Sequence, residues 1–239
     1  ANSTFKWINH EYEIRFAYEA TDKLIRFTDY KDIKYRSRKV FSFHRPEYLR
    51  SLLAAPDTIR NNMKNFPELD TTRFRDCQIN AIKNMDKSFS ENRPRALVQM
   101  ATGAGKTFTA ITEAYRLLKY AKMNRILFLV DTKSLGEQAE REFLAYTPND
   151  DTRSFSQLYG VRRLKSSYIP NDVQICISTI QRMYSILKEE DIKASFFVIG
   201  KYVKNHPDIV KREYEEGHYI ANHGYDHNNS KLYASSESF

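Results

Sequence analysis

The chain is poor in the cysteines that cross-link extracellular proteins and in the apolar runs that cross membranes. It has two cysteines among 239 residues, and Cys77 and Cys176 are far apart and lack metal-ligand spacing. We therefore expect two reduced thiols, as in a cytoplasmic protein. No apolar run reaches the length of a membrane span, and no basic stretch followed by an apolar one opens the chain. These absences predict a cytoplasmic protein without a membrane partner. Because the first residue is Ala, we expect it to be a piece of a longer chain.

Basic residues outnumber acidic ones over most of the sequence, with 38 Lys and Arg against 30 Asp and Glu in all. The net charge is +8 overall, with +6 in residues 1–100, +4 in residues 101–187 and −2 in residues 188–239. A positively charged protein of this kind is suited to binding a polyanion such as DNA, although proteins without a nucleic-acid role also carry charges of this size. The change of sign near residue 188 indicates a boundary between two parts.

The sequence has no internal repeat and no low-complexity tract. Its helices and strands are therefore predicted from hydrophobic periodicity. Two stretches that alternate with period two, 13–18 and 24–29, predict a hairpin that turns near Thr21-Asp22. Helices are predicted over 47–53, after a proline, and over 75–89, where apolar residues share one face.

From residue 96 the pattern alternates between apolar stretches and amphipathic ones. The predicted strands cover 96–100, 126–130 and 173–177, and the predicted helices cover 106–122 and 137–146. Apolar strands that alternate with helices predict an α/β fold with a parallel sheet and right-handed crossovers. Residues 147–170 are expected to form a long polar connection.

A glycine-rich turn, ATGAGKT at residues 101–107, joins the first of these strands to its helix. Such a turn directs several backbone N–H groups at one point, and the helix dipole adds positive charge there, which makes a phosphate cradle. Lys106 would reach the β- and γ-phosphates of a nucleotide, and the Thr107 hydroxyl would hold Mg²⁺. The strict pattern has Gly where Met100 stands, so the match is to the compact variant of helicase-like ATPases. The alternative is a chance Gly-Lys-Thr at a helix start.

Three segments lead up to this loop: FSFHRPE at 41–47, RDCQ at 75–78 and NRPRAL at 92–97. With them, the chain resembles the R subunit of type I restriction enzymes, a superfamily 2 helicase-like motor, from about residue 25 to residue 187. The resemblance implies ATP and Mg²⁺ as cofactors and double-stranded DNA as a partner. It also implies association with the specificity and methylation subunits of a restriction complex.

The same resemblance implies how the chain is divided. Residues 71–187 would be an incomplete P-loop (RecA-like) lobe. Residues 1–70 would be a small α+β segment, the end of a nuclease-type domain with its linker. His44 lies in that segment among aromatic residues, and we expect it to be a packing or hydrogen-bonded histidine.

The resemblance also implies site residues. Gln78 would read the adenine edge, unless it is a surface residue of its helix. Thr132 with Lys133, and Thr179 with Gln181, would be DNA-backbone contacts at strand ends, although such residues also serve as helix N-caps. The implied nucleotide-binding residues are Gln78, Thr102, Gly103, Ala104, Gly105, Lys106 and Thr107.

The carboxylates that ATP hydrolysis needs are missing. Hydrolysis requires an acidic side chain on Mg²⁺ and a group that orients water, and the resembled family carries them on the strand after Gln181. Here the next apolar strand, 194–199, ends without an acidic pair, and a second motor lobe is absent. We expect ATP binding without translocation. The strand at 194–199 is expected to replace the missing strand in the sheet.

The last quarter of the chain carries a different pattern: ASFFVIG at 194–200, NHP at 205–207 and EGHYIANHGYDH at 216–227. Residues 188–239 thereby resemble a partial polysaccharide deacetylase, with a βαβ segment. That family holds a divalent metal, often Zn²⁺, with two histidines and an aspartate. His223 and His227 match the two histidines, while the motif that supplies the aspartate is missing. The alternative is a pair of surface histidines.

The two resemblances meet at Ile186-Leu187-Lys188, which fits a natural fusion, a rearranged gene or an artificial chimera. Three functions remain open at this point: an ATP-binding, DNA-associated restriction motor fragment, a metal-dependent deacetylase fragment, and a chain with no intact activity.

Overall fold

The computed structural model describes residues 14–93, 95–189, 195–198, 200–205, 207–215 and 219–222. The chain divides into two compact units. The first comprises Ala1–Lys165 with Ile169–Thr179, and the second comprises Ser166–Tyr168 with Ile180–Phe239.

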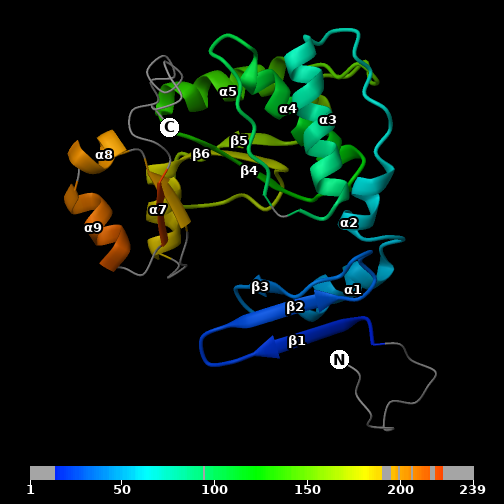
Figure 1. Ribbon diagram of the computed structural model, residues 1–239, viewed down its shortest axis with the longest axis vertical. Helices are drawn as coiled ribbons and strands as arrows, with labels where there is room; N and C mark the ends of the chain where they lie inside the picture. The colour runs from blue at the N-terminus through cyan, green and yellow to red at the C-terminus, as the bar shows by residue number, and fades with distance from the viewer. Residues whose placement is uncertain are drawn as a thin grey trace, which may run out of the picture. The chain divides into compact units, whose positions relative to one another are not determined.

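The N-terminal part of the first unit is a three-stranded antiparallel sheet, drawn in blue in Figure 1. Strands β1 (Phe16–Ala20) and β2 (Ile25–Asp29) form the predicted hairpin, and the turn is closed by a Thr21 N–H bond to Leu24 O at 2.8 Å. Strand β3 (Arg38–Val40) pairs with β2 and was not predicted. Its three residues are too few to show an alternating pattern.

Helix α1 (Pro46–Ala54) follows this sheet where the sequence predicts it. Just before it, His44 Nδ1 lies 2.7 Å from the Tyr18 hydroxyl, and its ring packs edge-on against Phe27 at 4.6 Å. Burial lowers the pKa of His44. The expectation of a packed, hydrogen-bonded histidine is confirmed.

The region between α1 and the next long helix is not wholly irregular. It contains helix α2 (Ile59–Asn62) and the 3₁₀ helix η1 (Met63–Asn65). The Thr58 hydroxyl accepts from Asn61 N–H at 3.2 Å and caps α2. Helix α3 (Asp76–Ser90) then forms close to its predicted bounds, with Ile82 fully buried on its apolar face.

The rest of the first unit is a parallel sheet with helices, in the α/β arrangement that the sequence predicts. Strands β4 (Ile126–Val130), β5 (Val161–Arg163) and β6 (Ile175–Thr179) run parallel in the order β4-β6-β5 (Figure 1). Helices α4 (Lys106–Lys119), α5 (Lys133–Ala145) and α6 (Phe155–Leu158) complete it. The core cluster comprises Ile111, Ala114, Tyr115, Leu118, Ala139, Phe143, Tyr146, Phe155, Ile175 and Ile177.

Two short elements, α6 and β5, occupy the stretch expected to be a polar connection, so that expectation was wrong. Phe155 of α6 is fully buried, and β5 pairs with β6 through Val161 and Arg163. A single buried aromatic residue and a three-residue strand produce no periodic signal in the sequence. In the structure β5 nevertheless forms one edge of the sheet.

The strand predicted over 96–100 is also wrong. Residues 95–100 have no regular structure, and Leu97 is 91% exposed. Among the described residues, β6 is the only strand paired with β4, whose Leu127 and Leu129 are about half exposed. A strand needs a neighbour to satisfy its backbone N–H and C=O groups. An apolar sequence alone therefore does not make 96–100 a strand.

The second unit has a sheet of its own. It contains α7 (Ile180–Glu189), β7 (Ser195–Val198), α8 (Gly200–Asn205), α9 (Pro207–Glu215) and β8 (Tyr219–Asn222). Strand β7 pairs with β8 in parallel, with Ser195 opposite Tyr219, and the intervening helices complete a β–α–β arrangement. The expectation that 194–199 joins the sheet of the first unit is wrong, because β8 is the partner of β7. None of the helices in the described ranges is long and apolar enough to span a membrane.

Candidate functional site

The phosphate loop, residues 101–107, turns through two glycines. Gly103 and Gly105 have φ of +78° and +84°, in the left-handed region that residues with side chains rarely adopt. The Ala104 N–H donates to Ala101 O at 3.2 Å within this turn. Gly105 is the N-cap of α4, so the loop leads directly into the first turn of the helix.

The first turn of α4 leaves backbone amides outside the helical ladder. The ladder begins with the bond from Thr109 N–H to Gly105 O at 3.0 Å, so the amides of residues 106–108 precede it. Amides at this position, together with the positive end of the helix dipole, form an anion site. Lys106 is exposed, and its ammonium donates to Met100 O at 3.3 Å and to Ala101 O at 3.1 Å. Thr107 follows it and is half-buried.

Gln78 joins α3 to the loop. Its side-chain amide N–H donates to Ala104 O at 2.9 Å, and its carbonyl oxygen accepts from Arg75 N–H at 3.0 Å. A Cβ atom on Gly105 would lie 2.2 Å from Gln78 Nε2, so the approach requires glycine there. Gln78 is 6% exposed, which excludes the alternative of a surface glutamine. Reading adenine stays a prediction.

Arg75 makes a second bond from α3 to the loop, and sequence reasoning did not assign it a role in the site. Its guanidinium donates to Gly103 O at 2.9 Å. The available signal was its position three residues before Gln78, which places both at the start of the same helix. Arg75 and Gln78 thus donate to the carbonyl oxygens of Gly103 and Ala104, which lie in the turn between the two left-handed glycines. These bonds hold the loop in its turn.

Aromatic rings pack behind the first turn of α4. The ring of Phe108, the residue after Thr107, lies 5.2 Å from that of Phe74 and 5.5 Å from that of Tyr146. Tyr146 in turn donates its hydroxyl to Thr112 Oγ1 at 3.0 Å. This stack links the start of α4 to the segment before α3 and to the end of α5.

The middle of α4 buries charges, and these were not predicted. Arg116 donates to Asp86 of α3 at 2.8 Å and to Pro67 O at 2.8 Å. Glu113 is 5% exposed, and neither of its carboxylate oxygens has a hydrogen-bond partner. Burial, with the neighbouring Asp86 charge, raises the pKa of Glu113 to about 8. Burial also raises the pKa of Asp86, against the opposing effect of Arg116. The signal was two opposite charges three residues apart in a stretch, 107–118, that holds no other charge.

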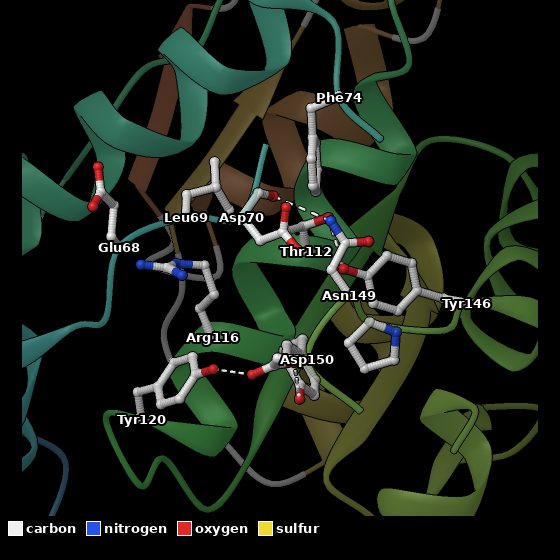
Figure 2. Close-up of a pocket in the computed structure, with 12 residues that line it drawn as sticks. Glu68, Leu69, Asp70, Phe74, Thr112, Arg116, Tyr120, Tyr146, Asn149 and Asp150 are labelled. Atoms are coloured by element: carbon white, nitrogen blue, oxygen red, sulfur yellow. Dashed lines mark hydrogen bonds between the residues drawn. The ribbon is translucent and has the colours of Figure 1, made fainter. Parts of the chain in front are cut away.

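Arg116 also lines a cavity of about 60 Å³ (Figure 2). On one side of it Asp150 accepts hydrogen bonds from Tyr115 at 2.7 Å, from Lys119 at 2.8 Å and from Tyr120. Although burial opposes this, the three donors lower the pKa of Asp150. These bonds anchor the segment after α5 to α4.

The predicted DNA-contact residues fall at the ends of strands, where the sequence places them. Thr132 and Thr179 follow β4 and close β6, and the register pairs Val130 with Thr179, so both lie at the carboxyl edge of the sheet. Thr132 accepts from Leu135 N–H at 3.3 Å and is the N-cap of α5. The alternative interpretation of this residue as a helix N-cap is therefore confirmed. Lys133 is exposed at the first position of α5. Gln181 lies in α7, within the second unit.

The structure therefore brings Gln78 together with residues 101–107, and places Thr132 and Thr179 at the same edge of the sheet. His223 and His227 lie outside the described residues. Within the part of the chain that the structure describes, no group of three His, Cys, Asp or Glu side chains could hold a metal ion.

Two family models match different parts of the chain. The polysaccharide deacetylase model matches residues 172–238. The chain is 51% identical over 55 residues to a peptidoglycan-N-acetylglucosamine deacetylase of Bacillus cereus, which covers 23% of this chain and 20% of that protein. No solved structure matches the chain.

The other model is that of the type III restriction enzyme res subunit, which matches residues 71–200. The chain is 32% identical over 178 residues to the endonuclease subunit of the type I restriction enzyme EcoKI of Escherichia coli (strain K12), covering 73% of this chain and 15% of that protein. It is 27% identical over 142 residues to a type I restriction enzyme endonuclease subunit of Staphylococcus aureus (strain COL), covering 59% and 14%. The chain thus spans about a seventh of the length of these relatives. Since the res-subunit model covers more than half of its residues, the chain belongs to the family of the type III restriction enzyme res subunit.

Proposed function

We propose that the phosphate loop binds ATP with Mg²⁺, and that the chain is the nucleotide-binding portion of a DNA-associated restriction motor. The observation that carries the proposal is the loop itself. Two left-handed glycines lead into the first turn of α4, and Gln78 and Arg75 hold the loop carbonyls in place. A glycine-rich turn of this kind suits a triphosphate because backbone amides at a helix N-terminus can point at one anion.

The donor set fits this cofactor. Lys106 would exchange its bonds to the loop carbonyls for the β- and γ-phosphates, and Thr107 would supply one oxygen to Mg²⁺. The ion, when bound, would neutralise phosphate charge, and phosphate oxygens and water would complete its coordination. Gln78 would read the adenine edge with the second N–H of its side-chain amide and keep its bond to Ala104 O. Thr102 and Ala104 would contribute backbone contacts within the same turn.

We infer binding without translocation. A hydrolytic motor needs a carboxylate on Mg²⁺, and among the described residues no strand after Gln181 joins the sheet of β4, β5 and β6. Strand β7 ends without an acidic pair and is paired with β8 instead. The chain would therefore hold nucleotide and fail to convert it into movement.

DNA contact is the second part of the proposal. Thr132, Lys133, Thr179 and Gln181 would bind the sugar–phosphate backbone of double-stranded DNA without reading its sequence. The relatives are subunits of restriction enzymes, and this supports assembly into a multi-subunit complex. Specificity and methylation subunits are the partners that we propose for it.

Titration calorimetry with ATP and Mg²⁺ tests the nucleotide site. We expect saturable binding by the wild-type chain and no measurable binding by Lys106→Ala, because the variant loses the cation that faces the phosphates. Lys23→Ala, which removes an exposed lysine from the β1–β2 turn, should bind as the wild type does. No measurable affinity of the wild-type chain at millimolar nucleotide would contradict the proposal.

A second candidate function rests on the match of residues 172–238 to the deacetylase model. His223 and His227 would then hold Zn²⁺. The wild-type chain should take up Zn²⁺, lose it on His223→Ala, and release acetate from acetylated sugar oligomers. An unchanged metal content in the variant would count against this candidate.

A further inference from the structure

A second, larger cleft lies away from the phosphate loop, between η1 and α3. Its volume is about 240 Å³, and three lysines line it, Lys64 of η1 with Lys83 and Lys87 of α3. Met63 and Phe66 form an apolar part of its wall. We call it the lysine cleft.

The lysines of this cleft have no partners in the described part of the chain. All three are exposed, and none forms an ion pair or hydrogen bond through its ammonium there. The carboxylate nearest in sequence, Asp86, is bonded to Arg116 at 2.8 Å. The lining carries four positive charges, on the three lysines and Arg116, and two negative charges, on Glu68 and Asp86. Its net charge is therefore +2. Figure 2 shows Arg116 and Glu68, which the cleft shares with the smaller cavity.

Two of the three lysines lie side by side on α3. Lys83 and Lys87 are four residues apart, so their side chains lie on the same face of the helix and repel each other. Because all three ammonium groups are exposed, an anion can reach them from solvent. An oxyanion between the ammonium groups would turn the repulsion into attraction.

The lysine cleft is separate from the phosphate loop. Gln78, which contacts the loop, and Lys87 are nine residues apart on α3. In an α-helix nine residues correspond to two and a half turns, so the two side chains lie on opposite faces and about 13 Å apart along the axis. One phosphate group cannot contact both.

We propose that the lysine cleft binds phosphate groups, either as free phosphate or as the backbone of DNA. Each ammonium offers three donors and a full positive charge, which is how lysine recognises phosphate. The proposal does not depend on nucleotide binding at the phosphate loop.

The test compares two triple variants with equal loss of charge, both made in the Lys106→Ala background so that the phosphate loop does not contribute. The cleft variant carries Lys64→Gln, Lys83→Gln and Lys87→Gln. The control carries Lys23→Gln, Lys39→Gln and Lys165→Gln, at exposed lysines outside the cleft. Binding of a short duplex DNA is measured by fluorescence anisotropy at several salt concentrations, and binding of inorganic phosphate is measured by calorimetry.

If the cleft holds the DNA backbone, its variant should bind DNA at least tenfold more weakly than the control. Its slope of log affinity against log salt should be shallower by about 3, close to one for each lysine. If the cleft holds free phosphate, the cleft variant should lose phosphate binding and bind DNA as the control does. Equal behaviour of the two variants toward both ligands would overturn the proposal. Circular dichroism of both variants verifies that they are folded.

Discussion

The first turn of α4 and its third turn use polar groups in opposite ways. At the first turn the important groups are backbone amides and an exposed lysine, and side chains from α3 support them through bonds to carbonyl oxygens. At the third turn the side chains of Glu113 and Arg116 are buried, and burial raises the pKa of Glu113. A change at the first turn should therefore affect binding most, and a change at the third turn should affect stability most.

The largest expected effect is at Arg116. In Arg116→Met the half-buried carboxylate of Asp86 loses its cation, and we expect the free energy of unfolding to fall by about 3 kcal/mol. Urea denaturation measures the change. In the double variant Arg116→Met with Asp86→Asn much of the stability should return, because no unpaired charge remains. Equal stability of the single and double variants would contradict this account.

The next effect depends on pH and involves Glu113. Its pKa is raised from 4.5 to about 8 in the folded state, so the folded protein binds this proton more tightly than the unfolded chain. The resulting stability is fully present below pH 4.5 and is lost as the pH rises from 4.5 to 8.

Glu113→Gln should therefore match the wild type near pH 4.5 and exceed it at pH 8, by roughly 2–4 kcal/mol in the free energy of unfolding. Denaturation curves at the two pH values measure this difference. A difference between variant and wild type that is the same at both pH values would show that Glu113 is not protonated in the fold.

The smallest effects on stability, and the most specific effects on binding, are expected in the loop. Gly105→Ala combines a left-handed φ with a Cβ 2.2 Å from Gln78 Nε2. It should cost about 2 kcal/mol of stability and abolish measurable ATP binding, because Gln78 must move. Gly103→Ala is the matched control, since its φ is similar but its Cβ would meet nothing within 4 Å. It should cost about 1 kcal/mol and weaken binding less. Equal effects of the two changes would mean that the contact with Gln78 is unimportant.

The phosphate loop was predictable because its residues are contiguous and its glycines have a strict conformational role. The hairpin and the long helices were predictable from periodicity. The bond from Gln78 to the loop was not, since it joins residues 26 positions apart. The ion pair between Asp86 of α3 and Arg116 of α4 was not predicted for the same reason, since its residues are 30 positions apart. The strand expected at 96–100 failed because strand formation depends on a neighbour that local sequence does not describe.

The support of the loop by α3 has a consequence for limited proteolysis. Residues 95–99 are exposed and irregular, and Arg95 offers trypsin a cleavage site between α3 and the loop. A cut there would break the covalent connection and leave the bonds of Arg75 and Gln78 to the loop intact. The two fragments should then remain associated on gel filtration, although denaturing electrophoresis would show two bands.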